Sequence, residues 1–177
     1  MQLSVANNTA TTEEQYIEVV TGKTAALFAA ACEVGAVVAD RPAAEQKALY
    51  DFGLNLGIAF QLIDDVLDYS AVQARLGKEV GNDFREGKMT LPVLLAFERG
   101  SADEKAFWQR TLENRIYNEA DLGHAIELLQ KHNALATAVE RAHQYAKTAS
   151  GLLSGFADAP LKTAMLESVA FVVDRGY

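Results

Sequence analysis

Three aspartates lie close together in a segment that is otherwise apolar. Asp64, Asp65 and Asp68 stand in the run 60–69, which reads FQLIDDVLDY. On a helix, Asp64 and Asp68 are one turn apart and share a face, while Asp65 is rotated by about 100° around the axis. Like charges at this spacing repel one another. A divalent cation with a bound anionic substrate would turn that repulsion into a binding site.

The position of these aspartates strengthens the prediction. A helix is expected from about 43 to 69, so the carboxylates fall near its C-terminal end, where the helix dipole disfavours negative charge. We therefore expect a local cation to hold them. The alternative is a solvated acidic face, because this spacing of acidic residues arises by chance in roughly a few per cent of chains of this size. The apolar neighbours Phe60 and Ile63 weaken the alternative without removing it.

Lysines next to glycines provide the complementary charge. Lys78 and Lys88 each follow a glycine in the polar segment 70–89, and Lys23 follows Gly22 at the expected start of a helix. Glycine lets the backbone approach an anion, a lysine offers a point charge to phosphate oxygens, and helix N-termini favour anions. Taken singly, each lysine is better explained as a surface residue, and neither Gly-Lys-Thr nor Gly-Lys-Met-Thr completes a Walker A loop. Together with the aspartates they predict a diphosphate site.

The rest of the pattern is helical almost throughout, with no clear strand. A capping box with Thr11 as N-cap and Glu14 three positions later opens the first helix, which Gly22 is expected to interrupt. After this first helix, which runs through Tyr16, Ile17 and Val20, the expected helical segments are 23–39, 43–69, 91–97, 102–113, 118–132, 134–156 and 160–174. The sequence thus predicts an all-α fold in one domain, 1–177, with 70–89 as a functional loop.

Composition excludes several classes of protein. A net charge of -8 argues against a nucleic-acid surface. The single cysteine, Cys32, cannot form an internal disulfide, which favours a reducing compartment, and we expect a cytoplasmic protein. The start has no signal-peptide pattern, and the longest apolar stretch, 25–39, contains Glu33 and is too short to span a bilayer. No transmembrane segment is expected.

The order of these motifs resembles one enzyme family. Gly22-Lys23-Thr24, then 60–68 (FQLIDDVLD), then 77–92 (GKEVGNDFREGKMTLP) is closely similar to the trans-isoprenyl diphosphate synthases, or polyprenyl synthetases. The ending 173–177 looks like that of members making octaprenyl or decaprenyl diphosphate. The resemblance implies the isoprenoid synthase fold, an antiparallel helical bundle around a cavity, assembled as a homodimer. It also implies Mg²⁺-dependent, head-to-tail condensation of an allylic diphosphate, such as farnesyl or geranyl diphosphate, with isopentenyl diphosphate to a long-chain all-trans product, which would suit ubiquinone synthesis.

The resemblance also assigns roles by position. Its metal site corresponds to Asp64, Asp65 and Asp68, with Asp64 the main ligand and the others ligating or holding metal-bound water. Its catalytic residues correspond to Asp64, Asp65, Lys23 and Lys78. Its substrate-binding residues correspond to Lys23, Thr24, Gln61, Lys78 and Lys88, with Lys88 approaching as the loop closes. Asp83 belongs to the loop motif and has no firm role.

This chain contains only the later part of the family pattern. The first aspartate-rich motif, its following arginines and the residues for isopentenyl diphosphate are absent, so we expect a C-terminal portion of a longer enzyme that is inactive alone. A non-catalytic partner that binds diphosphate or regulates a complete synthase is the alternative. A class I terpene cyclase is disfavoured by the loop 87–92. Uncovered helix faces would also promote self-association.

Overall fold

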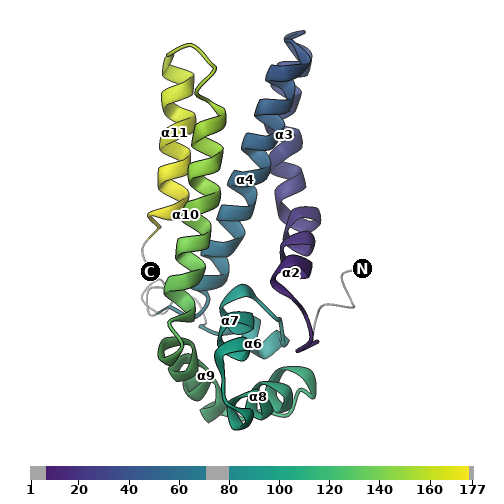
Figure 1. The fold of residues 1–177 in the computed structure, drawn as a ribbon, viewed down its shortest axis with the longest axis vertical. Helices are drawn as coiled ribbons and strands as arrows, with labels where there is room; N and C mark the ends of the chain where they lie inside the picture. Colours follow the sequence, from purple (N-terminus) through teal and green to yellow (C-terminus); the bar gives the residue numbers. More distant parts are fainter. Residues whose placement is uncertain (1–6, 71–79, 176–177) are drawn as a thin grey trace. The chain divides into compact units, whose positions relative to one another are not determined.

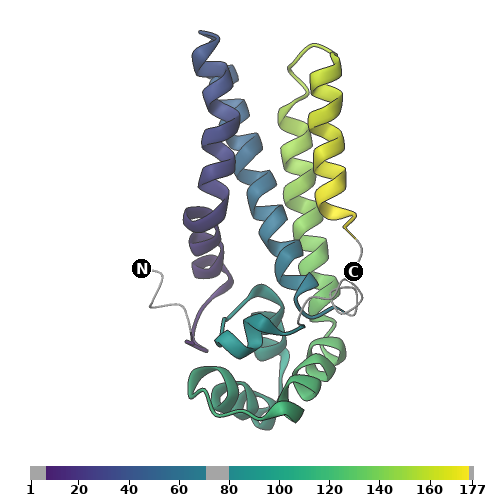
Figure 2. The same ribbon diagram turned by 180° about the vertical axis from the view of Figure 1, so that it is seen from behind.

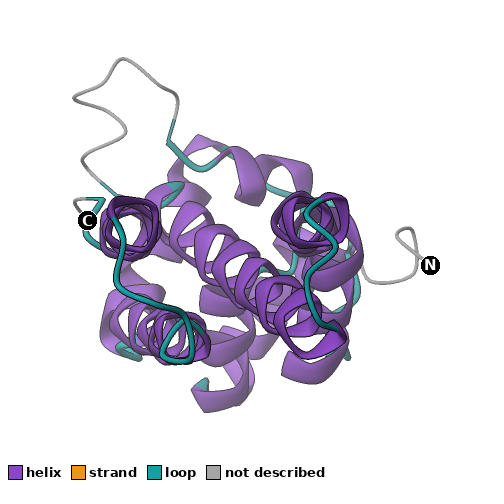
Figure 3. Ribbon diagram, turned by 90° about the horizontal axis from the view of Figure 1, so that it is seen from above, coloured by secondary structure: helices purple, strands orange, loops and turns teal. Residues whose placement is uncertain are grey.

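The regular elements of the protein are helices. The computed structural model describes residues 7–70 and 80–175, and within these ranges only helices and loops occur (Figure 3). The all-α prediction is therefore confirmed for the described part of the chain. The described residues form two compact units, unit 1 from segments 7–19 and 64–139 and unit 2 from segments 20–63 and 140–175. Each unit is considered by itself, and the single-domain organisation stays a prediction.

The observed helices follow the expected segments closely. They are α2 (Glu13–Val20), α3 (Ala26–Val38), α4 (Ala43–Leu67), α6 (Asn82–Glu86), α7 (Leu91–Arg99), α8 (Ala102–Trp108), α9 (Glu119–Lys131), α10 (Ala134–Leu152) and α11 (Pro160–Val173), with π-helical turns η1 (Thr21–Ala25) and η2 (Gln109–Glu113). Helix α4 ends two residues before the expected position, and α10 ends four residues before Phe156. Within the segment predicted as a loop, residues 82–86 form the short helix α6.

Two predictions about the first helix are wrong. The capping box uses Thr12 and Gln15, because the Thr12 hydroxyl accepts the Gln15 N–H and the Gln15 side chain accepts the Thr12 N–H. Gly22 does not interrupt the helix, since η1 joins α2 to α3 and the chain is helical from Glu13 to Val38. A glycine costs only about 1 kcal/mol inside a helix, which the flanking helical residues can override.

In unit 2, α3 packs tightly against the first part of α4. A Cβ on Gly53 would lie 2.3 Å from the Phe28 carbonyl oxygen, and one on Gly57 would lie 2.6 Å from the Ala25 Cα. The two helices run antiparallel, as do α10 and α11 (Figures 1 and 2). Small buried residues, Ala29 among them, form the face of α3 that meets α4. The glycines of α4 therefore allow the two backbones to approach closely.

The opposite face of α3 is apolar and exposed. Leu27 is 74% exposed and Val38 is 81% exposed. In the described part of the chain, one helix, Glu13–Val38, is long and apolar enough to cross a membrane by length and composition. Core helices of water-soluble proteins pass the same test, so this does not show a membrane span.

Unit 1 is built around the buried helix α7, which packs against α8 and α9. Helix α7 begins after Thr90, as predicted, with Pro92 in its first turn. Capping boxes at Ser101 and Asn118 start α8 and α9. The candidate site of this unit is carried by the end of α4 and by α6, which contacts η2.

Candidate active site

The three aspartates at the end of α4 occupy three different environments. Asp64 is exposed, and no described residue gives its carboxylate a hydrogen bond or ion pair. Asp65 is only 3% exposed. Asp68, one residue beyond the helix end, is about half-buried. Only Asp64 therefore presents its carboxylate openly to a ligand.

Asp65 is held by a tyrosine from α2. The Tyr16 hydroxyl, 49 residues away in sequence, donates a buried hydrogen bond to Asp65 Oδ2. Burial and the neighbouring Asp65 carboxylate raise the pKa of Tyr16 well above its usual value, so the hydroxyl stays a donor. A hydrogen-bond donor from α2 therefore contributes to holding Asp65, and the expected cation stays a prediction.

Replacing Tyr16 with phenylalanine is expected to lower the free energy of unfolding by about 1.5–3 kcal/mol, because a buried carboxylate loses its donor. The ring and its packing are kept, so the change isolates the hydroxyl. Urea unfolding followed by circular dichroism measures it. Tyr117→Phe is the matched control, since its hydroxyl makes a long 3.3 Å bond at an exposed site. Equal effects at both positions would contradict a special contribution of the Tyr16–Asp65 bond.

Asp68 is held by the backbone of α6. Its Oδ1 accepts the Asn82 N–H at 3.2 Å, and its Oδ2 accepts the Asp83 N–H at 2.9 Å. The Asp68 carbonyl oxygen also accepts the Gly81 N–H at 2.8 Å. Burial raises the pKa of Asp68, and these two carboxylate bonds oppose that rise. The α6 amides thus stabilise a negative charge that the end of α4 disfavours.

Lys88 lies at the other end of the same short loop. Its Nζ is 2.8 Å from Asp83 Oδ1 and 2.7 Å from Glu86 Oε2, and its N–H donates to the Asp83 carbonyl oxygen. Partial burial works to lower the pKa of Lys88, but the two carboxylates outweigh it and raise that pKa. The Lys88 side chain is 41% exposed and its ammonium is charged.

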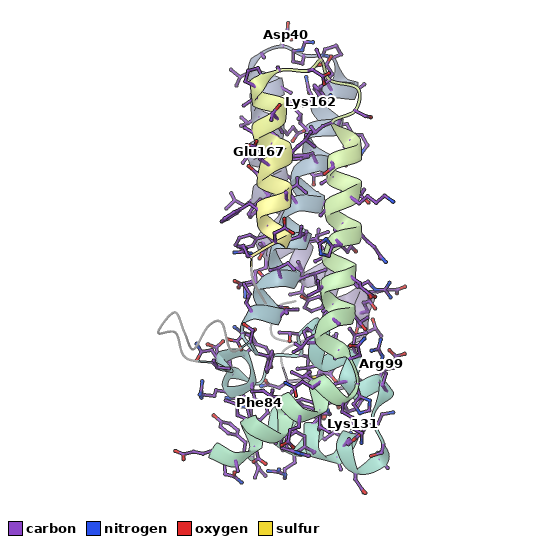
Figure 4. All side chains as sticks on the ribbon, turned by 90° about the vertical axis from the view of Figure 1, so that its left-hand side faces the viewer. Asp40, Phe84, Arg99, Lys131, Lys162 and Glu167 are labelled. Carbon is purple, nitrogen blue, oxygen red and sulfur yellow. The ribbon has the colours of Figure 1, made fainter. Side chains whose placement is uncertain are left out.

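Glycines and an arginine fix the shape of this loop. Gly81 and Gly87 flank α6 in the left-handed region, with φ of 80° and 70°. Phe84 buries its ring and meets Tyr117 edge-on at 5.6 Å, and the Arg115 guanidinium donates to the Arg85 carbonyl oxygen. Figure 4 labels Phe84 on this helix. The loop is therefore anchored on both sides of the Lys88 turn.

The remaining predicted residues belong mostly to unit 2. The Thr24 hydroxyl donates to Gln61 Oε1 at 2.8 Å, which joins two residues predicted to line one pocket. Lys23 is exposed beside Thr24. Lys78 lies outside the described residues. The structure thus links Asp68 to Lys88 through Asp83 in unit 1, and Thr24 to Gln61 in unit 2.

Sequence reasoning missed Tyr16, Arg115 and Arg175 as contributors. The Arg175 guanidinium lies 4.3 Å from the Phe60 ring centroid, next to Gln61. Each of the three residues contacts a partner at least 30 positions away. No local motif signals such contacts, so the sequence alone offers no means of finding them.

Unit 2 also contains a cavity of about 510 Å³ lined by α3, α4, α11 and the segment 153–159 that joins α10 to α11. Its lining is mainly apolar, with Arg41 and Lys162 among its charged residues. Figure 4 shows Lys162 near the same end of this unit as Asp40. Among the described residues, none of the predicted site residues lines it, so the candidate chemistry is assigned to the end of α4.

The oxygen ligands present suit a hard cation only in part. Within 7–70 and 80–175, no group of three or more His, Cys, Asp or Glu side chains lies close enough to hold a metal ion. Mg²⁺ is commonly bound by one or two carboxylates together with substrate phosphates and water. The open carboxylate of Asp64 fits that mode of binding and not an all-protein cage.

Comparison with known proteins decides the family. The family model described as Polyprenyl synthetase matches residues 1–129. The chain belongs to the polyprenyl synthetase family. The resemblance found in the sequence motifs is thereby confirmed.

Several relatives and solved structures similar to this chain are prenyl diphosphate synthases. Octaprenyl diphosphate synthase of Haemophilus influenzae is 39% identical over 176 residues, 99% of this chain and 53% of that protein. A decaprenyl diphosphate synthase from Rhodobacter capsulatus superposes with a TM-score of 0.93 at 43% identity, over 99% of this chain and 54% of the other. A polyprenyl synthase from Caulobacter crescentus, complexed with calcium and isoprenyl diphosphate, superposes with a TM-score of 0.93 at 43% identity. The match covers 99% of this chain and 54% of the other. The chain shares their isoprenoid synthase fold and spans about half their length.

Proposed function

We propose that this chain forms part of a magnesium-dependent trans-prenyltransferase. The reaction joins an allylic diphosphate, such as farnesyl diphosphate, head to tail with isopentenyl diphosphate. The observation that carries the proposal is the open carboxylate of Asp64, flanked by two anchored aspartates, in a member of the polyprenyl synthetase family. Octaprenyl and decaprenyl synthases among the relatives favour a long-chain all-trans product and a role in ubiquinone synthesis.

The residues of unit 1 would bind the charged end of the allylic substrate. Asp64 offers carboxylate oxygens to Mg²⁺, and Asp65 and Asp68 add negative charge beside it. Lys88 offers its ammonium to the diphosphate, after exchanging its contacts with Asp83 and Glu86. Bound Mg²⁺ would neutralise the charge that develops on the diphosphate leaving group. In this proposal Asp64 would hold the diphosphate through Mg²⁺, and Lys88 would contact it directly.

Residues of unit 2 and of the loop complete the proposal. Lys23 and Lys78 would contact the allylic diphosphate, and the bonded pair Thr24 and Gln61 would line the pocket near the reacting carbons. A hydroxyl and an amide that bond to each other are held in fixed rotamers, which favours a shaped pocket wall. The cytoplasmic location and the homodimer remain part of the proposal, and the exposed apolar face of α3 supports association with a further surface.

One observation favours a second candidate function. The described residues contain no group of three or more His, Cys, Asp or Glu side chains that could hold a metal ion. A non-catalytic partner that binds diphosphate or regulates a complete synthase would share this feature. The two functions differ in whether the candidate site residues, such as Asp64 and Lys88, take part in the condensation reaction.

The test is incorporation of labelled isopentenyl diphosphate onto farnesyl diphosphate in the presence of Mg²⁺. We expect no turnover by the chain alone. We expect turnover by a chimera in which this chain replaces the matching part of the Haemophilus influenzae octaprenyl diphosphate synthase. A folded chimera that binds inorganic pyrophosphate but stays inactive would favour the non-catalytic function. Turnover by the chain alone would show that its own residues complete the site.

A further inference from the structure

The third aspartate of the motif has a use that does not require a metal. We infer that Asp68 is a positioning residue, which holds α6 through its carboxylate and so places Lys88 for the diphosphate. The inference rests on the proposed function for the identity of the ligand. It goes beyond that function by separating the aspartate that faces a ligand from the one that organises the loop.

The first step of the argument is the engagement of both carboxylate oxygens. One oxygen accepts from Asn82 and the other from Asp83, at 3.2 and 2.9 Å. These N–H groups belong to the first turn of α6, where no intrahelical acceptor exists for them. Asp68 therefore does for α6 what an N-cap side chain normally does, although it lies 14 positions before Asn82. Gly81, which occupies the N-cap position, has no side chain and makes no cap bond.

The second step leads from α6 to Lys88. Asp83 donates its N–H to Asp68, and its carboxylate and carbonyl oxygens accept from the Lys88 ammonium and N–H. One residue thus links the aspartate motif to the lysine. Since only the backbone of α6 and the Asp83 side chain intervene, loss of the Asp68 carboxylate is expected to loosen the first turn of α6 and the contact of Asp83 with Lys88.

The third step is the contrast with Asp64. The Asp64 carboxylate is exposed, and no described residue bonds to it. The Asp68 carboxylate is about half-buried, with both oxygens engaged. The far side of the loop is fixed independently by the burial of Phe84 and by Arg115. Asp68 and this anchor together leave α6 little freedom, which suits a loop that must present one ammonium.

The first test measures amide hydrogen exchange at Asn82 and Asp83 in the chain itself. Asp68→Ala is expected to speed exchange of both amides by about tenfold or more, because they lose their acceptor. Asp68→Asn keeps one acceptor oxygen and is expected to retain the protection of one of the two amides. Asp64→Ala is the matched control and should leave both rates unchanged. Unchanged exchange in Asp68→Ala would overturn the inference.

The second test measures binding of Mn²⁺ with inorganic pyrophosphate, followed by the electron paramagnetic resonance of Mn²⁺. Asp64→Ala is expected to abolish binding, while Asp68→Asn stays within about threefold of the unsubstituted chain. The double variant Asp68→Ala with Lys88→Ala is expected to bind no more weakly than Lys88→Ala alone, because one change acts through the other. If Asp68→Asn lost the binding of Mn²⁺ and pyrophosphate as completely as Asp64→Ala, Asp68 would be a metal ligand and the inference would be overturned.

Failure of the proposed function would look different. If the unsubstituted chain does not bind Mn²⁺ and pyrophosphate, the assignment of the metal and diphosphate to this chain fails. The exchange rates of Asn82 and Asp83 then still decide whether Asp68 holds α6. Fast exchange of both amides in Asp68→Ala, together with retained protection of one amide in Asp68→Asn, supports the inference in either case.

Discussion

Replacing Asp64 with alanine is expected to lower magnesium-dependent condensation by the chimera by at least about 10³-fold, because metal-assisted charge neutralisation is worth several kcal/mol. Asp64 is the one aspartate of the motif that the described structure leaves open to a ligand. Its removal creates no cavity and breaks no bond to a described residue. The loss should therefore appear in turnover and not in folding.

Steady-state kinetics with farnesyl and isopentenyl diphosphates measures this effect, and thermal unfolding of the same variant checks the fold. Asp103→Ala is the matched control, because Asp103 is also an exposed aspartate on a helix of unit 1. It should leave turnover within about twofold, as exposed substitutions away from special features change little. If Asp64→Ala kept most of the activity, the metal site would have to be built without this chain's open carboxylate.

The helices of this protein were largely predictable from local signals. Pro42 and Pro160 mark helix starts, Gly100 marks a stop, and Ser101 and Asn118 are capping residues. These signals depend on neighbours in sequence, which is why the bounds agree to within a few residues. The error at Gly22 has the opposite origin. Whether a helix survives a glycine depends on what packs around it, and that information is not local.

The sequence indicates which residues could form the candidate site but not how their environments differ. The spacing of Asp64, Asp65 and Asp68 drew attention to the end of α4, and their membership of a metal site stays a prediction. Their difference comes from Tyr16 on α2 and from the amides of α6, which meet α4 only in the folded chain. The repulsion assumed from spacing alone is relieved by these donors. A sequence motif therefore indicates which residues lie near one another. The burial and hydrogen bonds of each side chain show which of them is open to a ligand.

The largest effect on stability is expected at Gly53, where alanine should lower the free energy of unfolding by about 3 kcal/mol or more. An added Cβ would lie 2.3 Å from the Phe28 carbonyl oxygen and 2.8 Å from the Ala29 Cα. Both neighbours are backbone atoms of α3, so no side chain can turn away to make room. Relief requires the separation of α3 and α4, which exposes the small residues packed between them. Urea unfolding followed by circular dichroism measures the change.

Gly35 provides the matched control, because it lies inside α3 and an added Cβ would meet nothing within 4 Å. Gly35→Ala is expected to raise the free energy of unfolding by about 0.5–1 kcal/mol, since alanine loses less backbone entropy in a helix. The same chemical change should thus have opposite signs on two neighbouring helices of one unit. Helix propensity alone predicts stabilisation at both positions, so destabilisation at Gly53 isolates the close approach of α3 to α4. A stabilised Gly53→Ala variant would mean that the two helices are farther apart in solution than the structure places them.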